Sequence, residues 1–236
     1  MQLSKSENKV YGMLKENSII TFKIRELCLL LKISKVEAYN IVKALKKKGA
    51  IKSIGGFFAL NESDEMVVAS SLHFPSYISF WSALNYYGFS DQMPRKIFIA
   101  TTSYRKEING FKYVTLSKKR FFGYKKIGDI IIAEPEKAIA DSLLLPRHSG
   151  GIREIMKVMK NALNEIEVKK LIGYSVRMGS KSVLRRLGFM LDMMGYKGKD
   201  IENIRKKIGK GYELLDPNLK RKNDINKEWL LDVNIK

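Results

Sequence analysis

The most constraining feature of this sequence is the pair Gly55-Gly56, which lies between two short apolar runs. The runs, residues 50–54 and 57–60, contain several Ile and Phe residues, which favour β-strands. Two consecutive glycines tolerate the positive φ angles that a two-residue turn requires. The pattern therefore predicts a β-hairpin. The preceding fifty or so residues must then belong to a fold that ends in this hairpin.

A helix with defined ends precedes this hairpin. Ser34 followed three residues later by Glu37 is a capping-box pattern, in which each side chain binds a free backbone N–H at the helix start. Gly49 is the residue type that commonly ends helices in a left-handed conformation. Between these ends, four apolar residues share one helical face: Ala38, Ile41, Val42 and Leu45.

Two further helical segments and one extended segment come before this helix. Apolar residues recur at helical spacing over residues 4–16 and 24–32. Residues 18–23 alternate briefly between polar and apolar and predict a short strand. The order helix, strand, helix, helix, hairpin is that of a winged helix-turn-helix domain, which we expect over residues 1–61.

The rest of the chain, residues 62–236, is predicted to be a second domain with a mixed α/β part followed by a helical part. The expected elements are a helix over 77–87, strands over 96–101, 111–116 and 129–133, a helix over 136–145, and helices from Gly151 to about residue 210. The segment after Asp216 is polar and charged, with a short helix expected around Trp229 and Leu230. Together these elements predict the α+β class.

Positive charge is concentrated in two parts of the chain. The 44 Lys and Arg residues outnumber the 24 Asp and Glu residues, so the formal net charge is +20 and a polyanionic partner is expected. The net charge is +8 over residues 1–61 and +9 over residues 151–236, whereas residues 62–150 carry +3. The predicted winged helix and the predicted C-terminal helices are therefore the two candidate anion-binding regions.

The outward face of the helix over residues 34–48 is the first candidate surface. The N-terminal residues of this helix enter the major groove in winged-helix proteins that bind DNA. We expect base-edge contacts from Lys35, Val36, Tyr39 and Asn40, and phosphate contacts from Lys43, Lys47 and the wing residue Lys52. A solvated lysine-rich helix is the alternative, but such faces normally mix Glu with Lys, and Glu37 is the only acid between residues 35 and 52.

A second basic cluster lies in the predicted C-terminal helices. Arg185 and Arg186 occur beside apolar residues that would pack inward, so we expect both arginines to face partly outward. In that orientation they would contact DNA phosphates or a protein partner. The alternative is that both side chains lie along the surface of the helical layer and help to stabilise it.

No arrangement suitable for catalysis or metal binding emerges from the sequence. The two histidines, His73 and His148, are too few and too far apart for a metal cluster. Glu134, Glu136 and Asp141 gather near one predicted helix start, where acidic side chains stabilise the helix dipole. We favour this structural role over an acid–base role for the three carboxylates.

One segment invites comparison with nucleotidyltransferases, whose sites begin with Gly-Ser and continue with an Asp-x-Asp pair that binds metal. Residues 179–181 are Gly-Ser-Lys, and Asp192 follows at a suitable distance. Met190 and Met194, however, occupy the positions where the second carboxylate would have to be, and two-metal chemistry needs both. We therefore expect a protein that is not an enzyme and has no metal or other cofactor.

The sequence also predicts a cytoplasmic protein. It contains no run of about 18 apolar residues that could span a membrane, and its first residues lack the apolar segment of a signal peptide. The single cysteine, Cys28, cannot form an internal disulfide, which agrees with a reducing compartment. On an apolar helix face, Cys28 is expected to be a small core residue.

Three segments together resemble the AbiEi family of antitoxins, which are transcriptional regulators encoded with abortive-infection systems against viruses. The first is Tyr-Ile-Ser-Phe-Trp-Ser-Ala-Leu-Asn-Tyr-Tyr-Gly at 77–88, and the second is Ala-Glu-Pro-Glu-Lys-Ala-Ile-Ala-Asp at 133–141. The third combines Gly-Ser-Lys at 179–181 with Arg-Arg-Leu-Gly at 185–188. The likeness extends over most of residues 5–195 and leaves out the tail beyond Asp216.

This resemblance implies a repressor that binds inverted repeats in its own promoter, on double-stranded DNA, through the winged helix. It also implies that the remaining domain antagonises a nucleotidyltransferase toxin, without requiring a stable complex. The alternative is a stand-alone winged-helix transcription regulator whose C-terminal region senses a ligand or forms a dimer. A third class, an enzyme fused to a DNA-binding domain, requires an acid–base or metal constellation that we do not find in the sequence.

Overall fold

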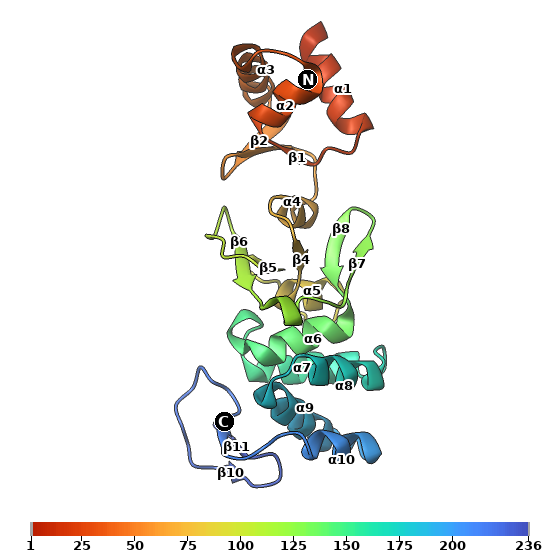
Figure 1. Ribbon diagram of the computed structural model, residues 1–236, viewed down its shortest axis with the longest axis vertical. Coiled ribbons are helices and arrows are strands. Elements are labelled where there is room, and N and C mark those ends of the chain that lie inside the picture. The colour runs from red at the N-terminus through yellow and green to blue at the C-terminus, as the bar shows by residue number, and fades with distance from the viewer. Residues whose placement is uncertain (1, 236) are drawn as a thin grey trace.

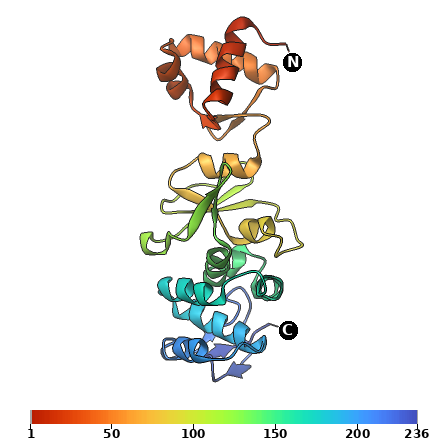
Figure 2. The ribbon, with the colours of Figure 1, turned by 90° about the vertical axis from the view of Figure 1, so that its right-hand side faces the viewer.

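The computed structural model describes residues 2–235 and shows a mixed α+β protein. Its layers follow one another along the long axis in chain order (Figure 1). The winged helix forms one end, followed by helix α4, a five-stranded sheet, several layers of helices and a small sheet at the C-terminal end. Figure 2 shows the same succession from the side, with the two ends of the chain far apart.

The predicted winged helix is confirmed. Its elements are α1 (Lys5–Glu16), β1 (Thr21–Phe22), α2 (Ile24–Leu31), α3 (Lys35–Lys47), β2 (Ile51–Ile54) and β3 (Phe57–Leu60), with the strand order β1-β3-β2. Helix α3 begins where the sequence predicts, because the Ser34 hydroxyl accepts a hydrogen bond from the Glu37 backbone N–H at 3.1 Å. The hairpin turn uses positive φ angles of 54° at Gly55 and 86° at Gly56.

The winged helix has its own small hydrophobic core. Ten buried residues form it: Val10, Leu14, Phe22, Leu27, Ala38, Val42, Leu45, Ala50, Ile51 and Leu60. Two residues of the hairpin, Ile54 and Ala59, belong instead to the larger cluster that runs through the rest of the chain. The wing therefore packs against this larger core, and the domain boundary at residue 61 stays a prediction.

The central sheet has the strand order β6-β5-β4-β8-β7. Its strands are β4 (Ser76–Ile78), β5 (Ile97–Thr101), β6 (Phe111–Thr115), β7 (Tyr124–Ile127) and β8 (Ile130–Ala133). The pairs β5–β6 and β4–β8 are parallel, whereas β4–β5 and β7–β8 are antiparallel. Helix α4 (Glu65–Ser71) covers the face toward the winged helix, and α5 (Phe80–Tyr86) and α6 (Pro135–Leu144) lie on the opposite side (Figure 1).

The helix predicted over residues 77–87 is partly wrong. Tyr77 and Ile78 lie in strand β4, and the next helix begins at Phe80. Strand β4 lies at the centre of the sheet and is buried on both faces, so it lacks the polar–apolar alternation that marks a half-exposed strand. Strand β7, which pairs with β8 at the sheet edge, was not predicted.

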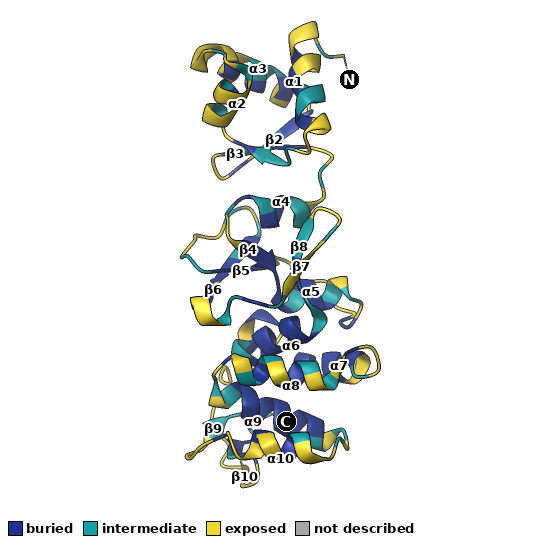
Figure 3. Ribbon diagram, turned by 45° about the vertical axis from the view of Figure 1, so that its right-hand side comes forward, coloured by how far each residue is buried: buried dark blue, intermediate teal, exposed yellow. Residues whose placement is uncertain are grey.

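Helix α6 is followed by α7 (Ile152–Ala162), α8 (Val168–Arg177), α9 (Lys181–Met193) and α10 (Lys199–Arg205). The tail then forms a three-stranded sheet of β9 (Glu213–Leu214), β10 (Ile225–Asn226) and β11 (Leu231–Asp232). The short helix expected around Trp229 is therefore wrong. Trp229 is completely buried, and a methyl group on Gly188 of α9 would overlap its indole ring. Figure 3 shows that α6 and α9 are largely buried, whereas α2 and α3 are largely exposed.

A buried ion pair lies in the core below the sheet. Lys137 and Asp141, one turn apart on α6, are fully buried and contact each other. The Tyr77 hydroxyl accepts a hydrogen bond from Lys137 Nζ at 3.0 Å, and Ser79 Oγ donates one to Asp141 Oδ2 at 2.8 Å. Burial lowers the pKa of Lys137 below its ordinary value. Asp141 thus balances a buried ammonium group, and the expectation that it stabilises the helix dipole is wrong.

No helix within residues 2–235 combines the length and the apolar character needed to cross a membrane.

Candidate nucleic-acid interface

The outward face of α3 is exposed over its whole length. The base-edge candidates Lys35, Val36, Tyr39 and Asn40 and the phosphate candidates Lys43 and Lys47 are all exposed. Two of these side chains expose apolar surface to solvent, since Val36 is 71% exposed and Tyr39 is 55% exposed. The opposite face packs into the small core through Ala38, Val42 and Leu45, which fixes which side of the helix is presented.

The lysines of this face are free of acidic partners. Within residues 2–235, no ion pair involves Lys35, Lys43, Lys46, Lys47 or Lys52. Lys48 differs, because its ammonium group lies 2.6 Å from Glu7 Oε2 and holds the pKa of that carboxyl below its ordinary value. This pair connects the end of α3 to α1. The remaining charges are available to a polyanion.

The wing contributes less charge than α3 and is attached to the rest of the molecule. Lys52 on β2 is half-exposed. The Phe57 ring of β3 packs edge to face on His73 with a centroid distance of 5.5 Å, and His73 packs on Tyr113 of β6 at 5.1 Å. Burial is the main cause that lowers the pKa of His73, followed by the charges of Arg105 and Lys23. This aromatic contact joins the wing to the central sheet.

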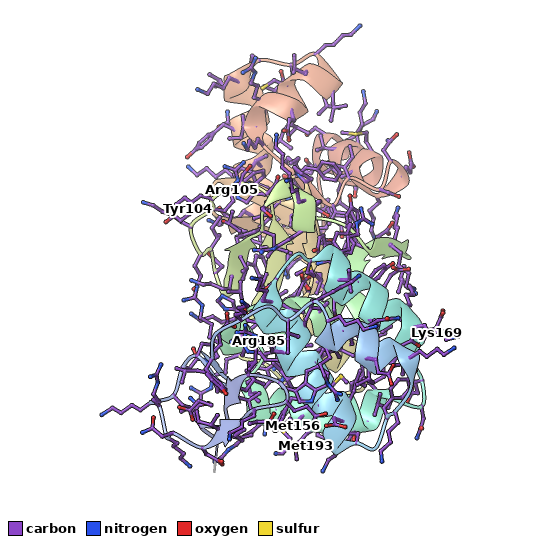
Figure 4. The ribbon with its side chains drawn as sticks, turned by 60° about the horizontal axis from the view of Figure 1, so that its bottom comes forward. Tyr104, Arg105, Met156, Lys169, Arg185 and Met193 are labelled. Carbon is purple, nitrogen blue, oxygen red and sulfur yellow. The ribbon has the colours of Figure 1, made fainter. Side chains whose placement is uncertain are left out.

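The expectation that Arg185 and Arg186 face outward is wrong. Arg185 is 1% exposed and Arg186 is 5% exposed. Arg185 donates to the carbonyl oxygens of Ile208 and Lys210 at 2.9 and 3.0 Å. Figure 4 shows Arg185 among the packed side chains of the helical region.

Arg186 has a similar structural role. Its guanidinium group donates to the carbonyl oxygens of Leu215, Leu143 and Leu214 at 2.9, 2.8 and 3.3 Å. A guanidinium group has five N–H donors, and here Leu214 and Leu215 after α10 and Leu143 at the end of α6 supply the acceptors. Neither arginine is available to DNA phosphates, so both are removed from the candidate interface.

The other residues considered for catalysis have structural contacts. Ser180 Oγ accepts a hydrogen bond from the Val183 backbone N–H at the start of α9, and Asp192 Oδ2 accepts one from Trp229 Nε1 at 3.3 Å. His148 packs against the rings of Phe80 and Phe98, and burial lowers its pKa to about 4. In the part of the chain that the structure describes, no three His, Cys, Asp or Glu side chains gather to hold a metal ion.

The loop over residues 102–110, between β5 and β6, was not singled out in the sequence. Its exposed residues are Tyr104, Arg105 and Lys106. They lie within residues 62–150, whose small net charge does not indicate an anion-binding surface. Only the folded chain brings this loop to the wing, through Ile108 and Gly55.

The fold resembles the crystal structure of the RV2827C protein from Mycobacterium tuberculosis, with a TM-score of 0.68 and a sequence identity of 12%. The similarity covers 98% of this chain and 92% of that chain. At this identity the likeness shows a shared fold over nearly the whole length. No protein-family model and no curated protein matches the sequence.

Proposed function

We propose that the protein is a non-enzymatic transcriptional repressor that binds its own promoter through the winged helix. The observation that carries this proposal is the exposed face of α3, whose lysines have no acidic partners within residues 2–235. In winged-helix proteins that bind DNA, this helix lies in the major groove. Val36 and Tyr39 would meet base edges there, Asn40 suits adenine, and Lys43 and Lys47 lie one and two turns further along.

We further propose that the domain after the winged helix acts as an antitoxin against a nucleotidyltransferase toxin. This half of the proposal is supported by the resemblance of the three segments at 77–88, 133–141 and 179–188 to the AbiEi family. Neutralisation needs no stable complex with the toxin. A nucleotidyltransferase reading frame beside the gene would favour this function over a stand-alone regulator with a ligand-sensing or dimerisation domain.

A binding titration on the protein's own promoter tests the DNA-binding half. We expect the affinity to fall roughly 10³-fold or more between 50 and 200 mM salt if at least six phosphates are neutralised. The Tyr39→Ala/Asn40→Ala double variant should lose roughly 30-fold or more of its preference for the promoter over random DNA, because it removes two base contacts that contribute about 1–3 kcal/mol each. Mobility shifts on the two DNAs measure both quantities.

The matched control is the Lys43→Ala/Lys47→Ala double variant. Because these lysines are assigned to phosphates, binding to promoter and random DNA should weaken equally and the salt dependence should become shallower. All four side chains are exposed, so circular dichroism should show unchanged unfolding. Retained promoter preference in the Tyr39/Asn40 variant would show that the recognition face is assigned wrongly.

Co-expression with the neighbouring toxin tests the antitoxin half. The full-length Tyr39→Ala/Asn40→Ala variant, expressed from an unrelated promoter, is expected to rescue growth as well as the unchanged protein does. The reason is that neutralisation is assigned to residues beyond 61, whereas both substitutions lie on α3. Loss of rescue at equal protein levels would contradict this separation, and failure of the unchanged protein to rescue would refute the antitoxin function.

A further inference from the structure

The loop between β5 and β6, residues 102–110, lies against the wing. A methyl group added to Gly55 at the wing turn would lie 2.5 Å from Ile108 Cγ2, so the two residues are in close contact. After burial, the charge of Arg105 in this loop contributes to lowering the pKa of His73. His73 itself packs on Phe57 of the wing. The contact between Ile108 and Gly55 therefore places this loop beside the wing.

The tip of the loop is exposed and basic. Tyr104 is 75% exposed, and Arg105 and Lys106 are also exposed. Figure 4 shows Tyr104 and Arg105 at the outer edge of the molecule. Within residues 2–235, neither Arg105 nor Lys106 forms an ion pair. The two cations are therefore free to meet an anion.

The acid of this loop does not cancel these charges. Glu107 lies 2.5 Å from Lys96 Nζ and 3.6 Å from Lys112 Nζ, so its carboxylate is already shared between two lysines next to the loop. The potential beyond the loop tip is consequently positive. Positive charge continues into the winged helix, because the ammonium group of Lys23 at the start of α2 lies 4.4 Å from the centre of the Phe57 ring.

The wing itself has no charge at its turn, which consists of Gly55 and Gly56. A wing lies beside the DNA when the recognition helix enters the major groove. The neighbouring loop supplies the cations that this wing lacks. We propose that Tyr104, Arg105 and Lys106 form a second phosphate-binding element, which contacts the same duplex as α3 beyond the wing; this rests on the DNA binding proposed above.

The test compares full-length variants in promoter titrations over a series of salt concentrations. The Arg105→Ala/Lys106→Ala variant should reduce the slope of log affinity against log salt by about 1.8, because two phosphate contacts are lost at about 0.9 each. The preference for promoter over random DNA should stay unchanged, since phosphates carry no sequence information. A hydroxyl-radical footprint on the promoter should lose protection at one flank of each half-site.

Lys118→Ala/Lys119→Ala is the matched control. These lysines are also exposed and unpaired within residues 2–235. They lie in a short turn away from the wing, where Arg120 donates a hydrogen bond to the Met178 carbonyl oxygen just after α8. This control should keep the slope and footprint of the unchanged protein. An equal loss of slope in both variants would assign the effect to net charge and overturn the loop site. The loop site would also be overturned if the Arg105→Ala/Lys106→Ala variant kept the slope of the unchanged protein. Salt-insensitive binding by the unchanged protein would instead refute the proposed function itself.

Discussion

Replacing Asp141 with Asn is expected to lower the free energy of unfolding by about 3–5 kcal/mol, because it leaves a buried ammonium group without its counter-charge. Lys137 and Asp141 are both fully buried, and the only other polar contact of the Lys137 ammonium group within residues 2–235 is the Tyr77 hydroxyl at 3.0 Å. Urea unfolding followed by circular dichroism at neutral pH measures the loss. Asp129→Asn is the control, since Asp129 forms an exposed pair with Lys126 and its removal should cost less than about 1 kcal/mol.

The pH dependence of this loss identifies its cause. Burial lowers the pKa of Lys137, and without Asp141 nothing opposes that effect. The unfolded state of the variant then binds more protons than the folded state, so the variant regains stability as the pH rises toward 10.5, the ordinary lysine value. The double variant Lys137→Met/Asp141→Asn should recover most of the loss at neutral pH. Equal effects of Asp141→Asn and Asp129→Asn would contradict the charged buried pair.

Replacing Trp229 with Ala is expected to lower the free energy of unfolding by about 3–5 kcal/mol, the usual cost of deleting a buried large aromatic side chain. Trp229 is completely buried against the Gly188 face of α9, and its Nε1 donates to Asp192 at 3.3 Å. A loss of about 1–3 kcal/mol or more is expected for Gly188→Ala, because the added methyl group overlaps the indole ring. Thermal unfolding followed by circular dichroism measures both variants.

The chain offers a control and a coupling test for this contact. Gly173 on α8 has no atom within 4 Å of an added methyl group, so Gly173→Ala should be neutral or stabilising by up to about 1 kcal/mol. In the double variant Gly188→Ala/Trp229→Ala the methyl group gains room, so the combined loss should be smaller than the sum of the two single losses. Strict additivity would show that Trp229 does not occupy the face of Gly188.

The three segments that resemble the AbiEi family meet in the interior of the fold. Tyr77 and Ser79 of the first contact Lys137 and Asp141 of the second, and Arg186 of the third donates to the end of α6. These segments therefore hold the sheet, α6 and the tail together. Their contacts are structural, and the residues proposed to bind DNA lie outside all three segments.

Local signals in the sequence were sufficient for the winged helix and for the candidate face of α3. The cap at Ser34, the glycines of the wing turn and the apolar stripe of α3 involve residues within a few positions of one another, so neighbouring residues alone encode them. The stripe determines which side of α3 is buried, and the exposure of its other side is a consequence of helical geometry.

Only the tertiary structure decided the rest of the site and much of the second domain. Arg186 is held in the interior by carbonyl groups as far as 43 residues away in sequence, and the tail packs on α9 through Trp229, whose ring lies against Gly188. The loop at Arg105 becomes a candidate DNA contact because Ile108 packs on Gly55. A sequence period describes how one element faces the core, but it carries no information about which distant element supplies the hydrogen-bond acceptor or the packing surface.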